Sequence, residues 1–147
     1  MKISQIMTSP AIHIHPAEQA LVAARMLTHY NIGALPVCTA DGRVCGIVTD
    51  RDLVTRCMAS GNPGGLLVRD VMTTGIAAVS PDTQVHAAAE LMGRRQIRRL
   101  PVVNRGRLCG IVTLADLAGA ADCSPDAAEA LERISSGVAS EKYLQNL

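Results

Sequence analysis

A threonine and an aspartate occur twice with the same spacing and in the same setting. The first pair is Thr49 and Asp52 and the second is Thr113 and Asp116; Gly-Ile-Val precedes each pair and leucine follows it. At a strand-to-helix junction, the carboxylate can accept bonds from ribose hydroxyls, and the helix N-terminus supplies donors for a phosphate. The same spacing also fits a capping box, in which the two side chains only complete the first helical turn. The pattern predicts two related strand-to-helix junctions, and each Thr-Asp pair can bind a ligand, cap the helix or do both.

The two junctions belong to an internal repeat of about 65 residues. Residues 6–38 align with 71–103 without a gap, and 43–53 align with 107–117 after the loss of one residue in a turn. The copies share a Met-Thr dipeptide, a Leu-Pro-Val tripeptide and the run that ends in Thr-x-x-Asp-Leu. A repeat of this length is typical of a supersecondary unit that buries its apolar face against its copy.

Each repeat predicts the order strand, helix, strand, strand, helix. Short apolar strands are expected over 11–14 and 76–79, each followed by a proline and then by small apolar residues at helical spacing. In the helices these apolar positions are 20, 24 and 27, and 85, 88, 89 and 92. Glycine-containing turns at 41–42 and 105–106 predict a hairpin in each repeat. The expected fold class is therefore α/β (α+β).

Composition divides the chain into four parts. The predicted parts are repeat 1 over 1–60, a linker rich in glycine and proline over 61–67, repeat 2 over 68–121, and a helical tail over 122–147. In the tail, Ser124-Pro125-Asp126 favours a helix start, so we expect a helix to about residue 135 and another from about residue 140.

Composition also excludes several classes of function. The chain has 147 residues, 48% of them hydrophobic, with neither phenylalanine nor tryptophan, so the core is aliphatic and no aromatic platform exists for stacking bases. A formal net charge of +1 lacks the positive field of a phosphate-backbone binder, so we expect no nucleic-acid partner. No signal peptide and no apolar run of about 18 residues is present, so we expect a cytoplasmic protein without a membrane partner.

The five cysteines are an odd number and contain no Cys-x-x-Cys pair. We interpret them as reduced thiols of a cytosolic core. The alternative is a metal or redox site, for which His13, His15 and Cys38 are the best candidates on neighbouring predicted strands, although their spacing is not typical of zinc.

The duplicated motifs, in this order, resemble a tandem cystathionine-beta-synthase (CBS) domain pair, the Bateman module, over residues 2–121. The likeness is greatest to the stand-alone bacterial CBS-pair proteins. It implies two β-α-β-β-α repeats packed with pseudo-twofold symmetry, and a homodimer of such pairs. It also implies a regulatory module that binds an adenosyl ligand, either AMP, ADP, ATP, NAD or S-adenosylmethionine, needs no cofactor, and acts on an unknown regulated protein.

The resemblance further implies which residues line the two clefts. In the family, each cleft is built from both repeats: the Thr-Asp junction of one repeat faces the first strand of the other repeat and the residues that lead into its Leu-Pro-Val tripeptide. One cleft would contain Thr49, Asp52, Thr73, Ala78, Ile97, Arg98 and Arg99. The other would contain Thr113, Asp116, Thr8, His13, Ile32, Gly33 and Ala34.

The two clefts are not expected to be equivalent. Guanidinium groups suit phosphate oxygens, so Arg98 and Arg99 predict a phosphorylated adenosine in the Asp52 cleft. The other cleft, with Gly33 and Ala34 at those places, is predicted to be empty, weaker or selective for an uncharged group. The alternative for the arginines is a solvated basic face shared with neighbouring arginines.

No catalytic motif accompanies the junctions. The chain lacks Gly-x-Ser-x-Gly and His-Glu-x-x-His, and no cysteine has a histidine at a known catalytic spacing. We therefore expect no enzyme, no catalytic residue and no metal site. The alternative function is a redox- or metal-responsive stress protein, or an interaction scaffold, whose nucleotide clefts are degenerate.

Overall fold

The computed structural model describes residues 1–120 and 124–136. These residues form two compact units that interleave along the chain. The Asp52 unit comprises Pro10–Ile76 and Val103–Cys109, and the Asp116 unit comprises Met1–Ser9, Ala77–Val102 and the described residues from Gly110 onward.

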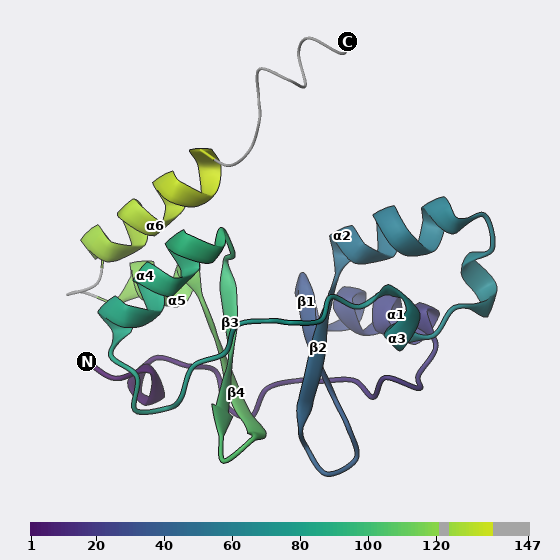
Figure 1. Cartoon of the computed structure of the whole chain (residues 1–147), viewed down its shortest axis with the longest axis horizontal. Coiled ribbons are helices and arrows are strands. Elements are labelled where there is room, and N and C mark those ends of the chain that lie inside the picture. The colour runs from purple at the N-terminus through teal and green to yellow at the C-terminus, as the bar shows by residue number, and fades with distance from the viewer. Residues whose placement is uncertain (121–123, 137–147) are drawn as a thin grey trace, which may run out of the picture. The chain divides into compact units, whose positions relative to one another are not determined.

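The Asp52 unit contains one hairpin and several helical segments (Figure 1). Its strands are β1 (Ala34–Cys38) and β2 (Val44–Thr49), and its first helix is α1 (Ala20–Tyr30). A continuous helical stretch follows β2, as α2 (Asp50–Asp52), a π-helical turn (Leu53–Cys57) and a 3-10 turn (Met58–Ser60). A 3-10 turn (Pro63–Gly65) and α3 (Val68–Val71) lie in and after the segment predicted as a linker.

The hairpin is antiparallel, as predicted. Ala34 pairs with Thr49 and Val37 with Gly46, and a bulge follows at Cys38. Gly42 has a φ of 84°, a left-handed conformation that glycine adopts without a steric cost. The expected strand over 11–14 is wrong in extent: it forms a single parallel bridge, from Ile14 to Val37. Proline at residue 16 has no N–H to donate, which limits the pairing beyond this point.

An aliphatic core holds the Asp52 unit together. Helix α1 buries Ala20, Ala23 and Leu27, so the buried face includes Ala23, whereas the predicted Ala24 is only partly buried. Around these residues the core cluster contains Ile14, Leu35, Val37, Val48, Cys57, Val68 and Val71.

The Asp116 unit repeats this pattern and adds a helix. Its elements are a 3-10 turn (Ile3–Gln5), α4 (Val85–Arg95), β3 (Arg99–Asn104), β4 (Arg107–Thr113), α5 (Leu114–Gly119) and α6 (Ser124–Ser136). Strands β3 and β4 are hydrogen-bonded neighbours, and the tip of their hairpin groups with the Asp52 unit. The expected strand over 76–79 again forms one parallel bridge, from Val79 to Val102.

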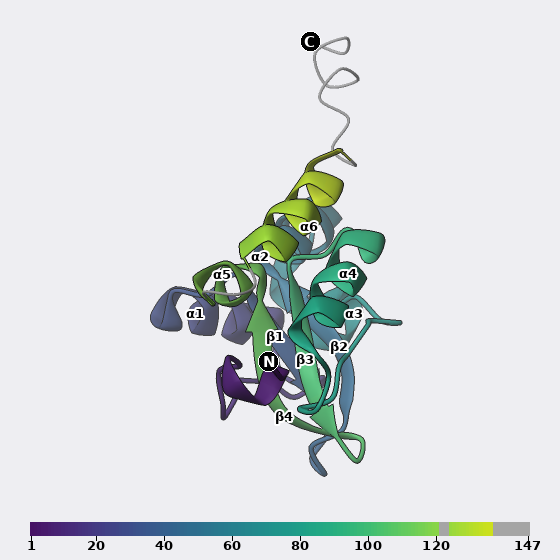
Figure 2. The same ribbon diagram turned by 90° about the vertical axis from the view of Figure 1, so that its left-hand side faces the viewer.

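Helix α6 confirms the first predicted helix of the tail. It packs against α4 and α5, as Figure 2 shows, and buries Ala127 and Ala130. The second predicted helix, from about residue 140, lies outside the described residues. In the described ranges, no helix is both long and apolar enough to cross a membrane.

Each Met-Thr dipeptide pairs with the strand that leads into a junction. Thr73 exchanges two backbone bonds with Ile47, of 2.8 and 3.0 Å, and Thr8 exchanges two with Ile111, of 2.9 and 3.0 Å. The leading segment of repeat 1 therefore belongs to the Asp116 unit, with the junction of repeat 2. In both units, a Met-Thr dipeptide therefore adjoins the strand that ends in the Thr-Asp junction.

Candidate functional site

Both Thr-Asp junctions are capping boxes. The Thr49 hydroxyl accepts a bond from the Asp52 N–H at 3.1 Å, and Asp52 Oδ2 accepts one from the Thr49 N–H at 3.0 Å. At the second junction the Asp116 N–H donates to the Thr113 hydroxyl at 3.2 Å, and the Thr113 N–H donates to Asp116 Oδ2 at 2.7 Å. These bonds satisfy donors that a helix N-terminus otherwise leaves without partners. The capping interpretation is therefore confirmed, and it is compatible with a second role.

The Asp52 carboxylate is buried and lies among polar groups. Asp52 is 7% exposed, and among the residues that the structure describes it is the only polar or charged residue that is buried. The Thr73 hydroxyl donates to both carboxylate oxygens, at 3.2 Å to Oδ1 and 3.4 Å to Oδ2. Arg56 Nε lies 3.9 Å from Oδ1. A buried carboxylate with such partners keeps acceptor capacity on Oδ1 that a ligand hydroxyl can use.

The Asp116 junction has a comparable arrangement. In addition to the capping bonds, the Thr113 hydroxyl donates to Asp116 Oδ2 at 2.8 Å. Asp116 is half-buried. Thr8 approaches through its backbone pairing with Ile111 of β4, two residues before Thr113. Thr8 and Thr73 therefore occupy corresponding places next to the two junctions.

The residues just before each Leu-Pro-Val tripeptide, Gly33 and Arg98, lie next to the Thr-Asp junction of their own repeat. The Asp50 N–H donates to the Gly33 carbonyl at 3.1 Å, and the Leu114 N–H donates to the Arg98 carbonyl at 2.8 Å. The backbone of Gly33 thus adjoins the Asp52 junction and that of Arg98 adjoins the Asp116 junction. The sequence instead grouped Gly33 with Asp116 and Arg98 with Asp52 across the two repeats, and that grouping stays a prediction. The cause is the antiparallel hairpin of each repeat: in the first, Ala34 at the start of β1 pairs with Thr49 at the end of β2, so the residue before β1 lies beside the residue after β2. The exposed Arg98 side chain consequently begins beside Asp116.

The remaining predicted residues are divided between the units. Ile32, Ala34 and His13 belong to the Asp52 unit, and Ala78, Ile97 and Arg99 belong to the Asp116 unit. Ala34 is buried in β1, whereas His13 and Ala78 are exposed. The predicted contacts that join residues of different units stay predictions.

Burial disfavours the thiolate form of two of the cysteines, Cys38 and Cys109. Burial, with a smaller contribution from neighbouring Cys45, raises the pKa of the Cys38 thiol to about 11. Burial also raises the pKa of the Cys109 thiol. A thiol must lose its proton to bind metal or act as a nucleophile. His13, His15 and Cys38 are not gathered into a metal site, and within residues 1–120 and 124–136 no group of three metal-binding side chains forms.

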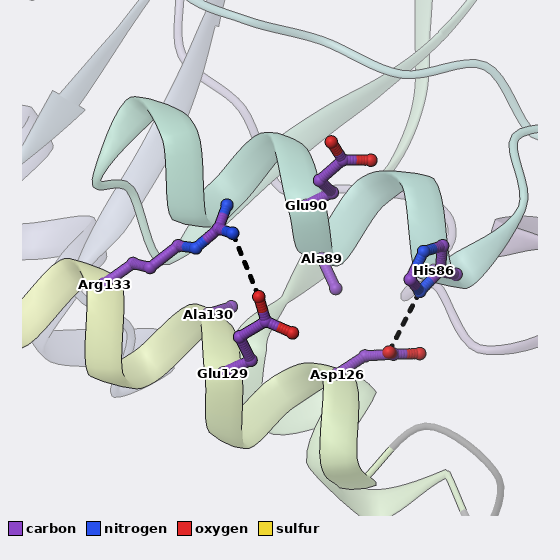
Figure 3. Close-up of a pocket in the computed structure, with 7 residues that line it drawn as sticks. All are labelled: His86, Ala89, Glu90, Asp126, Glu129, Ala130 and Arg133. Atoms are coloured by element: carbon purple, nitrogen blue, oxygen red, sulfur yellow. Dashed lines mark hydrogen bonds and ion pairs between the residues drawn. The ribbon is translucent and has the colours of Figure 1, made fainter.

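A groove between α4 and α6 was not predicted from the sequence. Its lining residues, shown in Figure 3, are His86, Ala89, Glu90, Asp126, Glu129, Ala130 and Arg133. Nδ1 of His86 donates to Asp126 Oδ1 at 2.9 Å, which joins the two helices. Along α6 itself, Arg133 pairs with Glu129 at 3.0 Å. The only signal in the sequence was the helix start at residue 124, which does not say where the helix docks.

We expect the His86–Asp126 ion pair to make the docking of α6 depend on pH. The hydrogen bond and charge of Asp126, with smaller contributions from Glu90 and Glu129, raise the pKa of His86 above 6.5. A group whose pKa rises on folding stabilises the fold fully below its unfolded pKa and loses this effect as the pH rises through the folded value. We expect the difference in unfolding free energy between wild type and His86→Gln to be constant below pH 6.5 and to shrink above it. Urea denaturation across pH measures this difference, and one that does not change would show that the pair does not stabilise the fold.

These features define a module of two interleaved repeats, each with a capped Thr-Asp junction at the start of its second helix. The CBS domain family matches residues 3–59 and 68–122, and the chain belongs to this family. The CBS domain-containing protein YhcV of Bacillus subtilis is 36% identical over 133 residues, which cover 90% of this chain and 94% of YhcV.

Two solved structures have the same fold. Hypoxic response protein I, solved with two coordinated zinc ions, has a TM-score of 0.75 and 32% identity, covering 81% of this chain and 98% of its own. The CBS domain pair of protein MJ0100 was solved in complex with 5′-methylthioadenosine and S-adenosylmethionine. Its TM-score is 0.74 at 28% identity, and the match covers 81% of this chain and 94% of that pair.

Proposed function

We propose that this protein is a regulatory module that binds an adenosyl ligand at its Thr-Asp junctions and signals by a change of conformation or self-association. The observation that carries the proposal is the buried Asp52 carboxylate at a helix N-terminus, with the Thr73 hydroxyl directed at it. The MJ0100 pair, solved with two adenosyl compounds, supports the class of ligand. A homodimer and a regulated protein partner are part of the same proposal.

The junction offers groups that suit the ribose of a nucleoside. Asp52 Oδ2 is engaged by the Thr49 N–H at 3.0 Å, while Oδ1 is bonded only by the Thr73 hydroxyl among the hydrogen bonds described. Both ribose hydroxyls can donate to a carboxylate, and each such charged bond contributes about 1.5–3 kcal/mol. In this proposal the two aspartates hold the ribose, and the threonine hydroxyls bond the ribose or the phosphate.

Arg98 gives the Asp116 junction its charge selectivity. Because the Arg98 carbonyl accepts the Leu114 N–H, the Arg98 side chain begins near the Asp116 junction, and in this proposal its guanidinium extends to a phosphate there. We therefore assign the phosphorylated ligand, AMP or ATP, to the Asp116 junction, and an uncharged or cationic adenosyl group to the Asp52 junction with its Gly33 approach. The other contacts in the proposal are Thr8, His13, Ile32, Ala34, Ala78, Ile97 and Arg99.

The test is calorimetric titration of nucleotide-stripped protein with AMP, ATP, NAD and S-adenosylmethionine. We expect saturable binding of at least one of these, weakened by about 100-fold or more in the Asp52→Ala/Asp116→Ala double variant, because charged hydrogen bonds are lost. Replacing both aspartates by asparagine is the matched control for folding, since an amide oxygen can still accept the capping bond. Wild-type protein that binds none of the four ligands would overturn the proposal and leave the junctions as helix caps.

The metal- or redox-responsive alternative has less support. Hypoxic response protein I contains zinc, but the pKa of the buried Cys38 thiol lies well above neutral pH. Thermal unfolding with zinc and with peroxide, beside the four nucleotides, separates the two functions. Stabilisation by zinc alone would favour the alternative.

A further inference from the structure

Helix α6 docks on α4 at a notch formed by a glycine. A Cβ atom added at Gly93 would lie 2.9 Å from Arg133 Cδ and 3.5 Å from the Ala130 Cα, so the two helices approach closely there. Ala89 of α4 and Ala130 of α6 face each other in the same interface (Figure 3). Glycine weakens the interior of a helix, and the docking of α6 gives Gly93 its structural reason. The equivalent residue of repeat 1 is Thr28, whose branched side chain would fill the notch.

Two hydrogen bonds join α6 to the segments that lead to the Asp116 junction. At one end of α6, the Ser124 hydroxyl donates to the Ala118 carbonyl of α5 at 3.5 Å. Near the other end, the Arg133 carbonyl accepts a bond from the Gln96 side chain, also at 3.5 Å. Helix α5 begins at the junction, and Gln96 lies two residues before Arg98, which is hydrogen-bonded to the first turn of α5. Both bonds to α6 are long, so close packing supplies most of its attachment.

The shortness of α5 makes this cover important. Helix α5 spans six residues, Leu114–Gly119, whereas an isolated helix in water needs about 12–15 residues to be even marginally stable. In the Asp52 unit, the corresponding helical stretch continues from Asp50 to Ser60. The order of the Asp116 junction therefore depends on packing from α6, while the Asp52 junction leads into a longer helical stretch of its own.

We propose that the docking of α6 is coupled to occupation of the Asp116 junction, so that α6 is the element through which this junction signals its ligand. While α6 is docked, α5 and the Arg98 backbone are held in the arrangement that binds the ligand. When α6 is released, the Thr113–Asp116 capping box loses its support and the affinity falls. Coupling of this kind is reciprocal, so a bound ligand tightens the docking of α6 by the same factor. The inference deepens the proposed function and rests on it for the identity of the ligand.

Amide hydrogen exchange of the ligand-free full chain tests the link between α6 and the junction. Ala130→Glu puts a charge into the buried side of α6 and is expected to release this helix without altering α4 or α5. Exchange of the Leu114 and Asp116 amides, which are hydrogen-bonded at the junction, should then accelerate by at least about 10-fold. The equivalent amides of Asp50 and Asp52 should keep their exchange rates, which shows that the chain is still folded.

Two further variants guard this test. Ala128→Glu adds the same charge on the exposed side of α6, and as the matched control it should leave the junction amides unchanged. Gly93→Thr fills the notch from the α4 side with the residue of repeat 1, and it should reproduce the effect of Ala130→Glu. Fast exchange across α6 in both releasing variants, with unchanged exchange at Leu114 and Asp116, would overturn the coupling.

Calorimetry with ATP tests the link to the ligand. We expect Ala130→Glu to raise the dissociation constant for ATP by about 10-fold or more, within the range of roughly 5- to 150-fold typical of coupled sites, and Ala128→Glu to leave it unchanged. Conversely, ATP should slow exchange across α6 in wild type and in Asp52→Ala, but not in Asp116→Ala.

The two proposals fail in different ways. ATP that binds wild type and Ala130→Glu equally would overturn the coupling and leave the ligand proposal standing. A wild type that binds no ATP, while the release of α6 still accelerates exchange at the junction, would support the link between α6 and the junction and overturn only the ligand proposal.

Discussion

The Gly46→Ala variant is expected to lose about 1–3 kcal/mol of unfolding free energy, the cost typical of overpacking a tight contact. A Cβ atom at residue 46 would lie 2.8 Å from the Thr73 carbonyl oxygen and 2.9 Å from the Met72 sulfur. The carbonyl cannot move away freely, because it accepts the Ile47 N–H at 3.0 Å while the Thr73 N–H donates back at 2.8 Å. The variant must therefore break this pairing or bend β2, and either change also displaces the Thr73 hydroxyl from Asp52.

Gly110→Ala should have a comparable effect on the Asp116 unit. Its Cβ atom would lie 2.9 Å from the Thr8 carbonyl oxygen and 2.8 Å from the Met7 sulfur. The matched control is Gly119→Ala at the end of α5, where nothing lies within 4 Å of the added atom. We expect the control to be neutral or stabilised by up to about 1 kcal/mol, since alanine favours a helix. Urea denaturation with equal m-values measures all three, and a Gly46→Ala variant as stable as the control would show that the Met-Thr segment is not held rigidly.

Arg98→Ala is expected to weaken ATP binding by about 10-fold or more, the value of a charge-assisted bond to phosphate, and to leave adenosine binding unchanged. The reason is the position of Arg98, whose carbonyl accepts the Leu114 N–H two residues before Asp116. If both residues contact one ligand, the effect of Arg98→Ala should largely disappear in an Asp116→Ala background. In an Asp52→Ala background the effect should persist in full, because distant substitutions are additive.

Calorimetry with ATP and with adenosine on the single and double variants measures this coupling. Arg95→Ala, which removes one exposed positive charge from the end of α4, is the control for general electrostatic attraction. Full coupling of Arg98 to Asp52 instead would contradict our assignment and restore the grouping expected from the sequence. Each aspartate variant also loses a capping bond, worth about 1 kcal/mol, so thermal unfolding must show that the protein is folded at the temperature of the titration.

Local patterns in the sequence determined the elements and the chemistry of the junctions. The repeat, the hairpins, the start of α6 and the Thr-Asp capping boxes all depend on residues close together in the chain, where spacing and turn preferences act directly. The one-residue error on α1, where Ala23 is buried and Ala24 only partly so, arose because both alanines fit a helical face. The short strands at Ile14 and Val79 were predicted too long because an apolar run does not state how many of its backbone groups find a partner.

The tertiary structure alone decided which segments meet. The sequence shows that Met-Thr and Gly-Ile-Val-Thr occur in both copies, but not that Thr8 pairs with Ile111 of the other copy. It also does not show that Arg98 lies at the Asp116 junction, or that α6 covers α4 while the equivalent face of α1 stays exposed. These pairings join residues far apart in the chain, and the contacts that select them form only when the chain closes its long loops, so periodicity and spacing carry no record of them.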